Sequence, residues 1–173
     1  GWFAWSASVL ADAGCAVVLP DRRGSGLNPE PRGDVAAAAR WLDDLDGIHR
    51  RIRQTFPGTS LAVLGVSWGG KLALVWERLR RPDVQRACLV APGICPAVDI
   101  GLPRRLQVLG TLLGGGGGRQ FAIPLNDPEL FTDNPQGHAF IAEDPLKLTR
   151  ATARFLFASA WLDWQVRRAP RGW

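Results

Sequence analysis

The chain has 173 residues, of which 46% are hydrophobic and 21% are charged. This length and composition are typical of a globular domain with a buried core, and they exclude a disordered or fibrous protein. The formal net charge is +5, but only Lys71 and Lys147 among its 21 basic residues are lysines. Because no recognised nucleic-acid-binding motif accompanies the arginines, we expect no nucleic-acid partner.

Cysteine spacing and hydropathy bear on metal binding, on membrane insertion and on the cellular location of the protein. Cys15, Cys88 and Cys95 have no C-x-x-C spacing, so we expect no metal, and Cys15 and Cys88 fall in apolar runs where a free Cys behaves as a small hydrophobe. No stretch reaches the ~18 apolar residues of a membrane span, and no signal peptide is visible. We therefore expect a cytoplasmic location, no stable membrane insertion and no cofactor. The chain has no Met, which indicates a processed start or a piece of a longer protein.

The first half of the chain alternates between helical and strand-like patterns. Apolar residues at 3–4 spacing predict helices over 2–13, 34–56 and 69–79, the second of them capped by Asp34. Short apolar runs predict strands at 15–19, 61–64 and 87–91. This alternation predicts an α/β fold in which helices flank a parallel sheet.

The second half has a different character. Residues 97–143 contain several prolines and a five-glycine run at 114–118, which predicts a flexible loop and no clean strand. Asp144 as a cap and Pro145 in the first turn predict a long helix that continues to Leu162. We therefore expect a core domain at 1–96 and a mostly helical cap at 97–173.

The stretch LAVLGVSWGGKLAL, residues 61–74, fits two motifs at once. One is G-x-S-x-G, the signature of a serine nucleophile on a tight turn, and the other is G-x-x-x-x-G-K, most of a phosphate-binding P-loop. A P-loop needs Ser or Thr after the lysine to hold magnesium, and Leu72 stands there. It also needs an acidic residue at the end of a later strand, where this chain has Pro92-Gly93. Nucleotide binding is therefore disfavoured.

The serine motif accounts for more of the stretch. Ser67 would lie on a strained turn between strand and helix, with Gly65 and Gly69 placed where a Cβ would clash. The helix that follows directs its N-terminus at the site, and the backbone N–H of Trp68 is the expected first oxyanion donor. Lys71 would merely follow the first helical turn. The open alternative is a glycine-rich turn that holds an inert serine.

Three segments in a fixed order resemble one family. LADAGCAVVLPDRRGSGLN, LAVLGVSWGGKLAL and RACLVAPGI together resemble an α/β-hydrolase of the lysophospholipase, monoacylglycerol-lipase and serine-aminopeptidase-like branch. The resemblance covers 1–96 well and 97–173 only as a loosely similar cap. It implies a serine hydrolase that cleaves a carboxylic ester or related acyl bond through an acyl-enzyme on Ser67. It also implies that Asp21 and Arg23 shape the edge of the sheet rather than react.

The rest of the catalytic triad is not recognisable. In the family, Asp or Glu and then His follow the serine on loops after later strands. His49 precedes Ser67, and His138 lies in the cap-like region, where a pairing with Asp133 lacks the expected context. We therefore expect the triad Asp and His and a second oxyanion donor to lie outside this chain, and the isolated chain to turn over little substrate. The alternative is a non-catalytic hydrolase-like binding module.

The resemblance also predicts a substrate class and a strand order. A small acyl ester or lipid-like molecule is the expected substrate, and the oligomeric state stays open. Apolar residues of the second half either line an acyl-chain pocket or form the cap's own core; they are Leu125, Leu130, Phe131, Phe140, Phe155, Phe157, Trp161 and Trp164. The strands at 15–19 and 61–64 should be parallel but not hydrogen-bonded to each other, and 61–64 should pair with 87–91.

Overall fold

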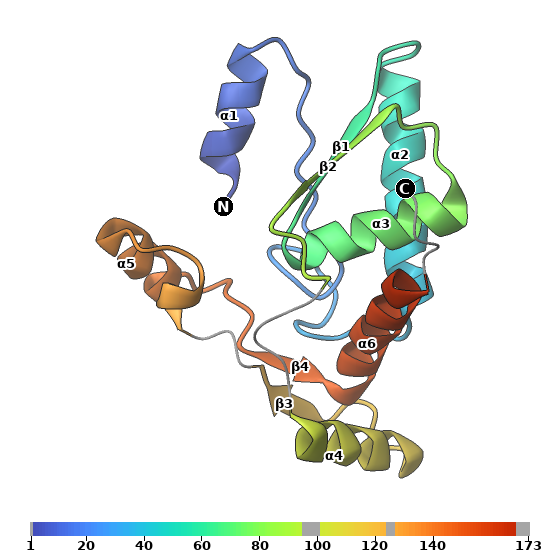
Figure 1. Cartoon of the computed structure of the whole chain (residues 1–173), viewed down its shortest axis with the longest axis vertical. Helices are drawn as coiled ribbons and strands as arrows, with labels where there is room; N and C mark the ends of the chain where they lie inside the picture. Colours follow the sequence, from blue (N-terminus) through green and yellow to red (C-terminus); the bar gives the residue numbers. More distant parts are fainter. Residues whose placement is uncertain (1, 95–100, 124–126, 169–173) are drawn as a thin grey trace.

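Helices and strands alternate along most of the chain in the computed structural model, which describes residues 2–94, 101–123 and 127–168 (Figure 1). In chain order the elements are α1 (Ala4–Asp12), α2 (Ala38–Thr55), β1 (Ala62–Val66), α3 (Trp68–Arg80), β2 (Arg86–Val90), α4 (Leu102–Leu113), β3 (Gln120–Ala122), the 3₁₀ helix η1 (Pro128–Leu130), α5 (Pro135–Glu143), β4 (Arg150–Thr152) and α6 (Ala153–Arg167).

The sheet that carries the serine motif is a parallel pair. β1 and β2 pair in parallel with Val63 opposite Ala87 and Leu64 opposite Cys88, and α3 forms the crossover between them. The predicted pairing of 61–64 with 87–91 is therefore confirmed, and so is the α/β class with helices flanking a parallel sheet. Figure 1 shows the two strands side by side with α3 running beneath them.

Helices from both halves of the sequence share the main core. The apolar face of α2 buries Trp41 and Leu42, α3 contributes Val75 and Trp76, and α6 adds Leu162. The apolar residues of α2 recur at helical spacing, which places them on one face toward the other two helices. Trp41, at 1% exposed, packs its ring edge-on against Phe155 of α6 at 5.0 Å between centroids. Residues on both sides of the boundary predicted at residue 96 therefore share one hydrophobic core.

The segment predicted as a strand at 15–19 forms none. Residues 15–19 connect α1 to the following loop, and within the described ranges β1 pairs with β2 alone. A strand needs a neighbour to satisfy its N–H and C=O groups, and no described strand lies beside this segment. Leu19 remains 56% exposed and Cys15 is also exposed, as is Cys88 in β2. The apolar runs that contain Cys15 and Cys88 therefore do not bury these two side chains; Cys95 lies outside the described residues.

The second half differs most from its prediction. α4 and α5 occupy stretches that the prolines and glycines made look like loop, and β3 pairs antiparallel with β4, with Phe121 opposite Ala151. No helix begins at Asp144. This residue instead ends α5 with ψ 110, because a residue before proline avoids the helical region. The long helix begins only at Ala153, where the Thr152 hydroxyl accepts a hydrogen bond from the Phe155 N–H.

Asp34 does not cap the helix that follows it. α2 begins later, after Ala37, whose side chain offers no cap. The Asp34 carboxylate instead accepts hydrogen bonds from Thr152 Oγ1 at 2.7 Å and from Arg154 Nε at 2.6 Å, and it forms an ion pair with Arg154. These contacts hold the pKa of Asp34 below its ordinary value of 3.8, through the hydrogen bond from Arg154 first and then the one from Thr152. Asp34 thus joins the loop before α2 to the start of α6.

Replacing Asp34 with Asn is expected to lower the free energy of unfolding at pH 7 by about 2 kcal/mol, since a charge-assisted pair is lost from a site where the Asp34 side chain is 11% exposed. Because the folded pKa is depressed, the wild-type contribution is complete above the unfolded pKa near 3.8 and is lost as the pH falls through the lower folded value. Urea unfolding from pH 7 to 3 checks this, with exposed Asp12→Asn as control. An identical pH slope in Asp34→Asn and wild type would contradict it.

Candidate active site

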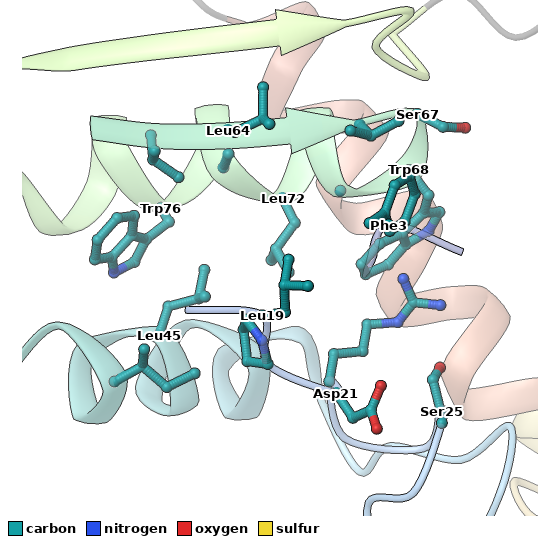
Figure 2. A pocket seen from close by; sticks show the side chains of 18 of the residues that line it. Phe3, Leu19, Asp21, Ser25, Leu45, Leu64, Ser67, Trp68, Leu72 and Trp76 are labelled. Atoms are coloured by element: carbon teal, nitrogen blue, oxygen red, sulfur yellow. The ribbon is translucent and has the colours of Figure 1, made fainter. Parts of the chain in front are cut away.

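Ser67 lies at the turn between β1 and α3. β1 ends at Val66, α3 begins at Trp68, and Ser67 between them has φ 51 and ψ −121. Positive φ is rare for a residue with a Cβ, so the turn holds backbone strain. Its N–H donates to Val90 O at 3.0 Å, and its carbonyl accepts from Gly70 N at 2.9 Å and from Gly93 N at 2.8 Å. The side chain is exposed at the end of the strand (Figure 2).

Two glycines make this turn sterically possible, but only one of them was predicted. A Cβ on Gly65 would lie 2.7 Å from Gly70 Cα, so the predicted close approach of strand and helix is confirmed there. Gly69 has no heavy atom within 4 Å of such a Cβ, and the prediction for it is wrong. The second tight position is Gly70, where a Cβ would lie 2.8 Å from Pro92 Cβ. The second of the two consecutive glycines in the sequence G-x-S-x-G-G is Gly70, and it faces the turn after β2. That extra glycine was the sequence signal for the second tight position.

Trp68 is the first residue of α3, so its backbone N–H has no acceptor within the helix. Its side chain is held from several elements. The indole Nε1 donates to Ser159 Oγ of α6 at 2.9 Å, and the ring packs edge-on against Trp41 of α2 at 4.8 Å between centroids. Phe155 stacks on it at 6.3 Å. The residue directly after Ser67 is therefore anchored to α2 and α6.

Lys71 is part of the same anchor and does not simply follow the first turn. Its residue is 5% exposed, and its Nζ donates to Asp163 Oδ1 at 2.6 Å and to Ser159 Oγ at 3.1 Å. Sequence reasoning missed this role because both partners lie about ninety residues away in α6. The helical spacing of Ser159 and Asp163, four residues apart, does place them on one face.

The loop after the 15–19 segment carries two arginines with different surroundings. Arg23 binds Asp44 at 2.8 Å and also pairs with Glu30, which fits the structural role expected of it. Asp21 accepts a hydrogen bond from the Leu27 N–H at 2.9 Å and so closes the same loop. Arg22 stacks over Trp68, with its guanidinium carbon 4.0 Å from the ring centroid. Burial lowers the pKa of Arg22 to about 10.

Neither histidine contacts Ser67. His49 in α2 approaches Asp83 O at 3.5 Å and packs edge-on against Trp76. His138 in α5 contacts Thr132 O. Among the hydrogen bonds and ion pairs of the described ranges, none joins His138 to Asp133. The two histidines therefore form no catalytic pair with Ser67 in this arrangement.

A large, mostly apolar hollow borders Ser67. It has a volume of about 1930 Å³ and extends between the 15–21 segment and the β1–β2 pair. Leu19, Leu45, Leu72 and Trp76 point into it from different elements, and Ser67 and Trp68 lie at one end (Figure 2). Of the apolar residues singled out in the second half, the hollow is lined by Phe131, Phe140, Phe155, Phe157 and Trp164. Phe155 also belongs to the core, and Leu125 lies outside the described residues.

The described ranges also bear on metal binding and on membrane crossing. Among them no group of three or more His, Cys, Asp or Glu side chains is placed to hold a metal ion. None of the described helices combines the length and apolar character needed to cross a bilayer.

A parallel pair flanked by helices, with a strained serine between strand and helix, defines the class as an α/β-hydrolase. The chain belongs to this family: the family model described as serine aminopeptidase, S33 (Hydrolase_4) matches residues 1–167. The chain is 36% identical over 75 residues to the AB hydrolase superfamily protein YfhM of Bacillus subtilis (strain 168); this match covers 42% of the chain and 25% of YfhM.

Comparison with solved structures gives the same fold. The monoacylglycerol lipase of Paleococcus ferrophilus superposes with a TM-score of 0.82 at 20% identity, over 97% of this chain and 62% of the lipase chain. The chain thus spans less than two thirds of either relative.

Proposed function

We propose that this chain carries the nucleophile of a serine hydrolase that cleaves a carboxylic ester or related acyl bond. The observation that carries the proposal is the backbone of Ser67, with φ 51 and ψ −121 at the junction of β1 and α3. This conformation costs free energy for any residue with a Cβ. A serine kept there, exposed and next to a helix N-terminus, fits a nucleophile better than an inert turn.

The chemistry follows from the groups around Ser67. Its Oγ attacks the acyl carbon, and the ester alcohol leaves as the acyl-enzyme forms. The Trp68 N–H and the positive end of the α3 dipole would stabilise the developing oxyanion. A base must take the Oγ proton and return it to the leaving alcohol. Since His49 and His138 contact other groups, we assign the base and its orienting acid to other parts of the full-length protein.

The substrate we propose is a small acyl ester or lipid-like molecule. The hollow beside Ser67 is lined mainly by apolar side chains, which suit an acyl chain, and Phe131 and Phe140 of the second half contribute to its wall. A relative of the same fold is a monoacylglycerol lipase. We further propose that 97–173 acts as a cap over a core at 1–96, with Gly65 and Gly70 allowing β1 and α3 to approach closely.

A second candidate is a hydrolase-like module that binds a ligand without catalysis. The specific observation in its favour is that both histidines of the chain are engaged away from Ser67. Such a module would keep the hollow and the turn but would not react with an electrophile that traps activated serines.

A fluorophosphonate probe distinguishes the two candidates. We expect the full-length protein to be labelled, with the adduct mapped by mass spectrometry to the peptide that contains Ser67. Ser67→Ala should lose the label, whereas Ser60→Ala, which changes an exposed serine just before β1, should keep it. Equal labelling of wild type and Ser67→Ala would exclude Ser67 as the nucleophile, and no labelling of wild type would favour the binding module.

A further inference from the structure

Arg22 is a cation that lacks a carboxylate partner in the described part of the chain. Its Nε has no solvent contact and no hydrogen-bond partner there. The neighbouring Arg23 is paired with Asp44 and Glu30, and Arg154 is paired with Asp34. The side chain of Arg22 rests instead on Trp68, at 4.0 Å, and near Phe155, at 6.0 Å. In the described residues its guanidinium therefore contacts two aromatic rings and no carboxylate.

Stacking leaves the binding edge of a guanidinium free. Cation–π contact uses the flat face of the group, whereas its N–H donors lie in the plane and can grip a carboxylate or phosphate in a bidentate manner. Although burial depresses the pKa of Arg22, the value of about 10 keeps the side chain protonated at neutral pH. Its residue is only partly buried and lines the hollow that Ser67 also borders.

A second unpaired polar group lies in the same loop. Ser25 Oγ is buried without a hydrogen-bond partner among the described residues, and Ser25 lines the same hollow. Buried polar groups without partners are rare in folded proteins, so two of them in one loop beside the hollow show that the described residues leave hydrogen-bonding capacity unused there. Of the nearby carboxylates, Asp163 pairs with Lys71, whereas Asp21 accepts the Leu27 N–H and is otherwise exposed to solvent. Figure 2 shows Asp21 and Ser25 on the loop below Trp68.

We propose that Arg22 and Ser25 form an anion-binding subsite beside Ser67, so that the substrate is an ester that also carries a carboxylate or phosphate group. That the bound molecule is an ester substrate rests on the proposed function, whereas the anion site itself does not. The anion would receive in-plane N–H bonds from the Nη groups of Arg22, and the enclosed Ser25 hydroxyl would have to turn toward the hollow to donate as well. The acyl carbon would lie at Ser67, on the other side of the Trp68 side chain.

The test compares esters of matched length in the full-length protein. p-Nitrophenyl hexanoate is neutral, the mono-p-nitrophenyl ester of adipic acid ends in a carboxylate, and the p-nitrophenyl ester of 6-phosphonohexanoic acid ends in a phosphonate. We expect wild type to prefer at least one anionic ester, and Arg22→Gln to lower that preference in kcat/KM about tenfold, since a charge-assisted bond is lost. Arg40→Gln, which changes an exposed arginine of α2, should retain the wild-type ratio.

A binding measurement separates this proposal from the proposed catalysis. In the Ser67→Ala background, inorganic phosphate or monomethyl adipate should raise the thermal midpoint, and adding Arg22→Gln should remove that rise. The two ligands distinguish a phosphate site from a carboxylate site. An unchanged ester ratio in Arg22→Gln together with an unchanged midpoint shift would overturn the subsite. A midpoint shift that depends on Arg22 in a protein without esterase activity would uphold the subsite and reject the hydrolase.

Discussion

Replacing Ser67 with glycine is expected to stabilise the fold and to abolish catalysis in the same molecule. Glycine adopts φ 51, ψ −121 without strain, which relieves about 1–3 kcal/mol, against roughly 0.5–1 kcal/mol of extra chain entropy lost on folding. We therefore expect the free energy of unfolding to rise by about 1 kcal/mol relative to Ser67→Ala. Esterase turnover should fall at least about 10³-fold in both variants, because the nucleophile is gone.

The two substitutions separate strain from chemistry. Ser67→Ala removes the hydroxyl but keeps a Cβ at the same backbone angles, so it should be as stable as wild type and as inactive as Ser67→Gly. Urea unfolding and p-nitrophenyl ester hydrolysis by the full-length protein measure the two effects. If Ser67→Gly is less stable than Ser67→Ala, the turn is not strained. Retained turnover in either variant would remove Ser67 from the mechanism.

Asp163→Ala is expected to cost about 3 kcal/mol of unfolding free energy. It leaves the Lys71 ammonium, whose side chain is 7% exposed, without its counter-charge inside the α3–α6 contact. Ser159 then remains as the hydrogen-bond partner of Lys71. Since Ser159 also anchors the Trp68 indole, the loss should lower kcat more than it raises KM.

A pair of control variants tests this interpretation. Replacing both partners, as Lys71→Met with Asp163→Leu, removes the buried charge and should recover most of the loss. Asp43→Ala breaks the exposed ion pair with Arg80, whose side chains are 51% and 37% exposed, and should cost less than about 1 kcal/mol. If Asp163→Ala lowers the free energy of unfolding no more than Asp43→Ala does, the interpretation is wrong. Water would then solvate the Lys71 ammonium once the carboxylate is removed.

Local signals predicted the part of the site that is contiguous in sequence. The apolar run before Gly65, the serine and the helical spacing after it determine β1, the turn and α3, because each depends on residues within a few positions. The same reasoning misplaced Asp34 and Asp144, since Asp can cap a helix, close a turn or pair with a distant arginine. Only the approach of Arg154 and Thr152, more than a hundred residues away, settles the role of Asp34.

The errors in the second half have a related cause. The prolines and glycines between 97 and 143 were interpreted as loop, yet Pro103 and Pro135 stand in the first turns of α4 and α5, where proline is tolerated. The three-residue strands β3 and β4 are too short for any alternation to be visible, and only their pairing defines them. Lys71 was missed for the same reason, as a lysine in a helix is normally solvated and its burial depends on α6.

The close contact between the turn after β2 and the start of α3 has an evolutionary consequence. The backbone of Ser67 is hydrogen-bonded to Val90 and Gly93, and Gly70 lies against Pro92 with no room for a side chain. A substitution that enlarges residue 70 can be accepted only if residue 92 shrinks or the segment 90–93 shifts, and such a shift would disturb Ser67 itself. Positions 65, 70 and 92 are therefore constrained to change together, so divergence in this lineage should accumulate elsewhere, in the loops and on the exposed faces of the helices.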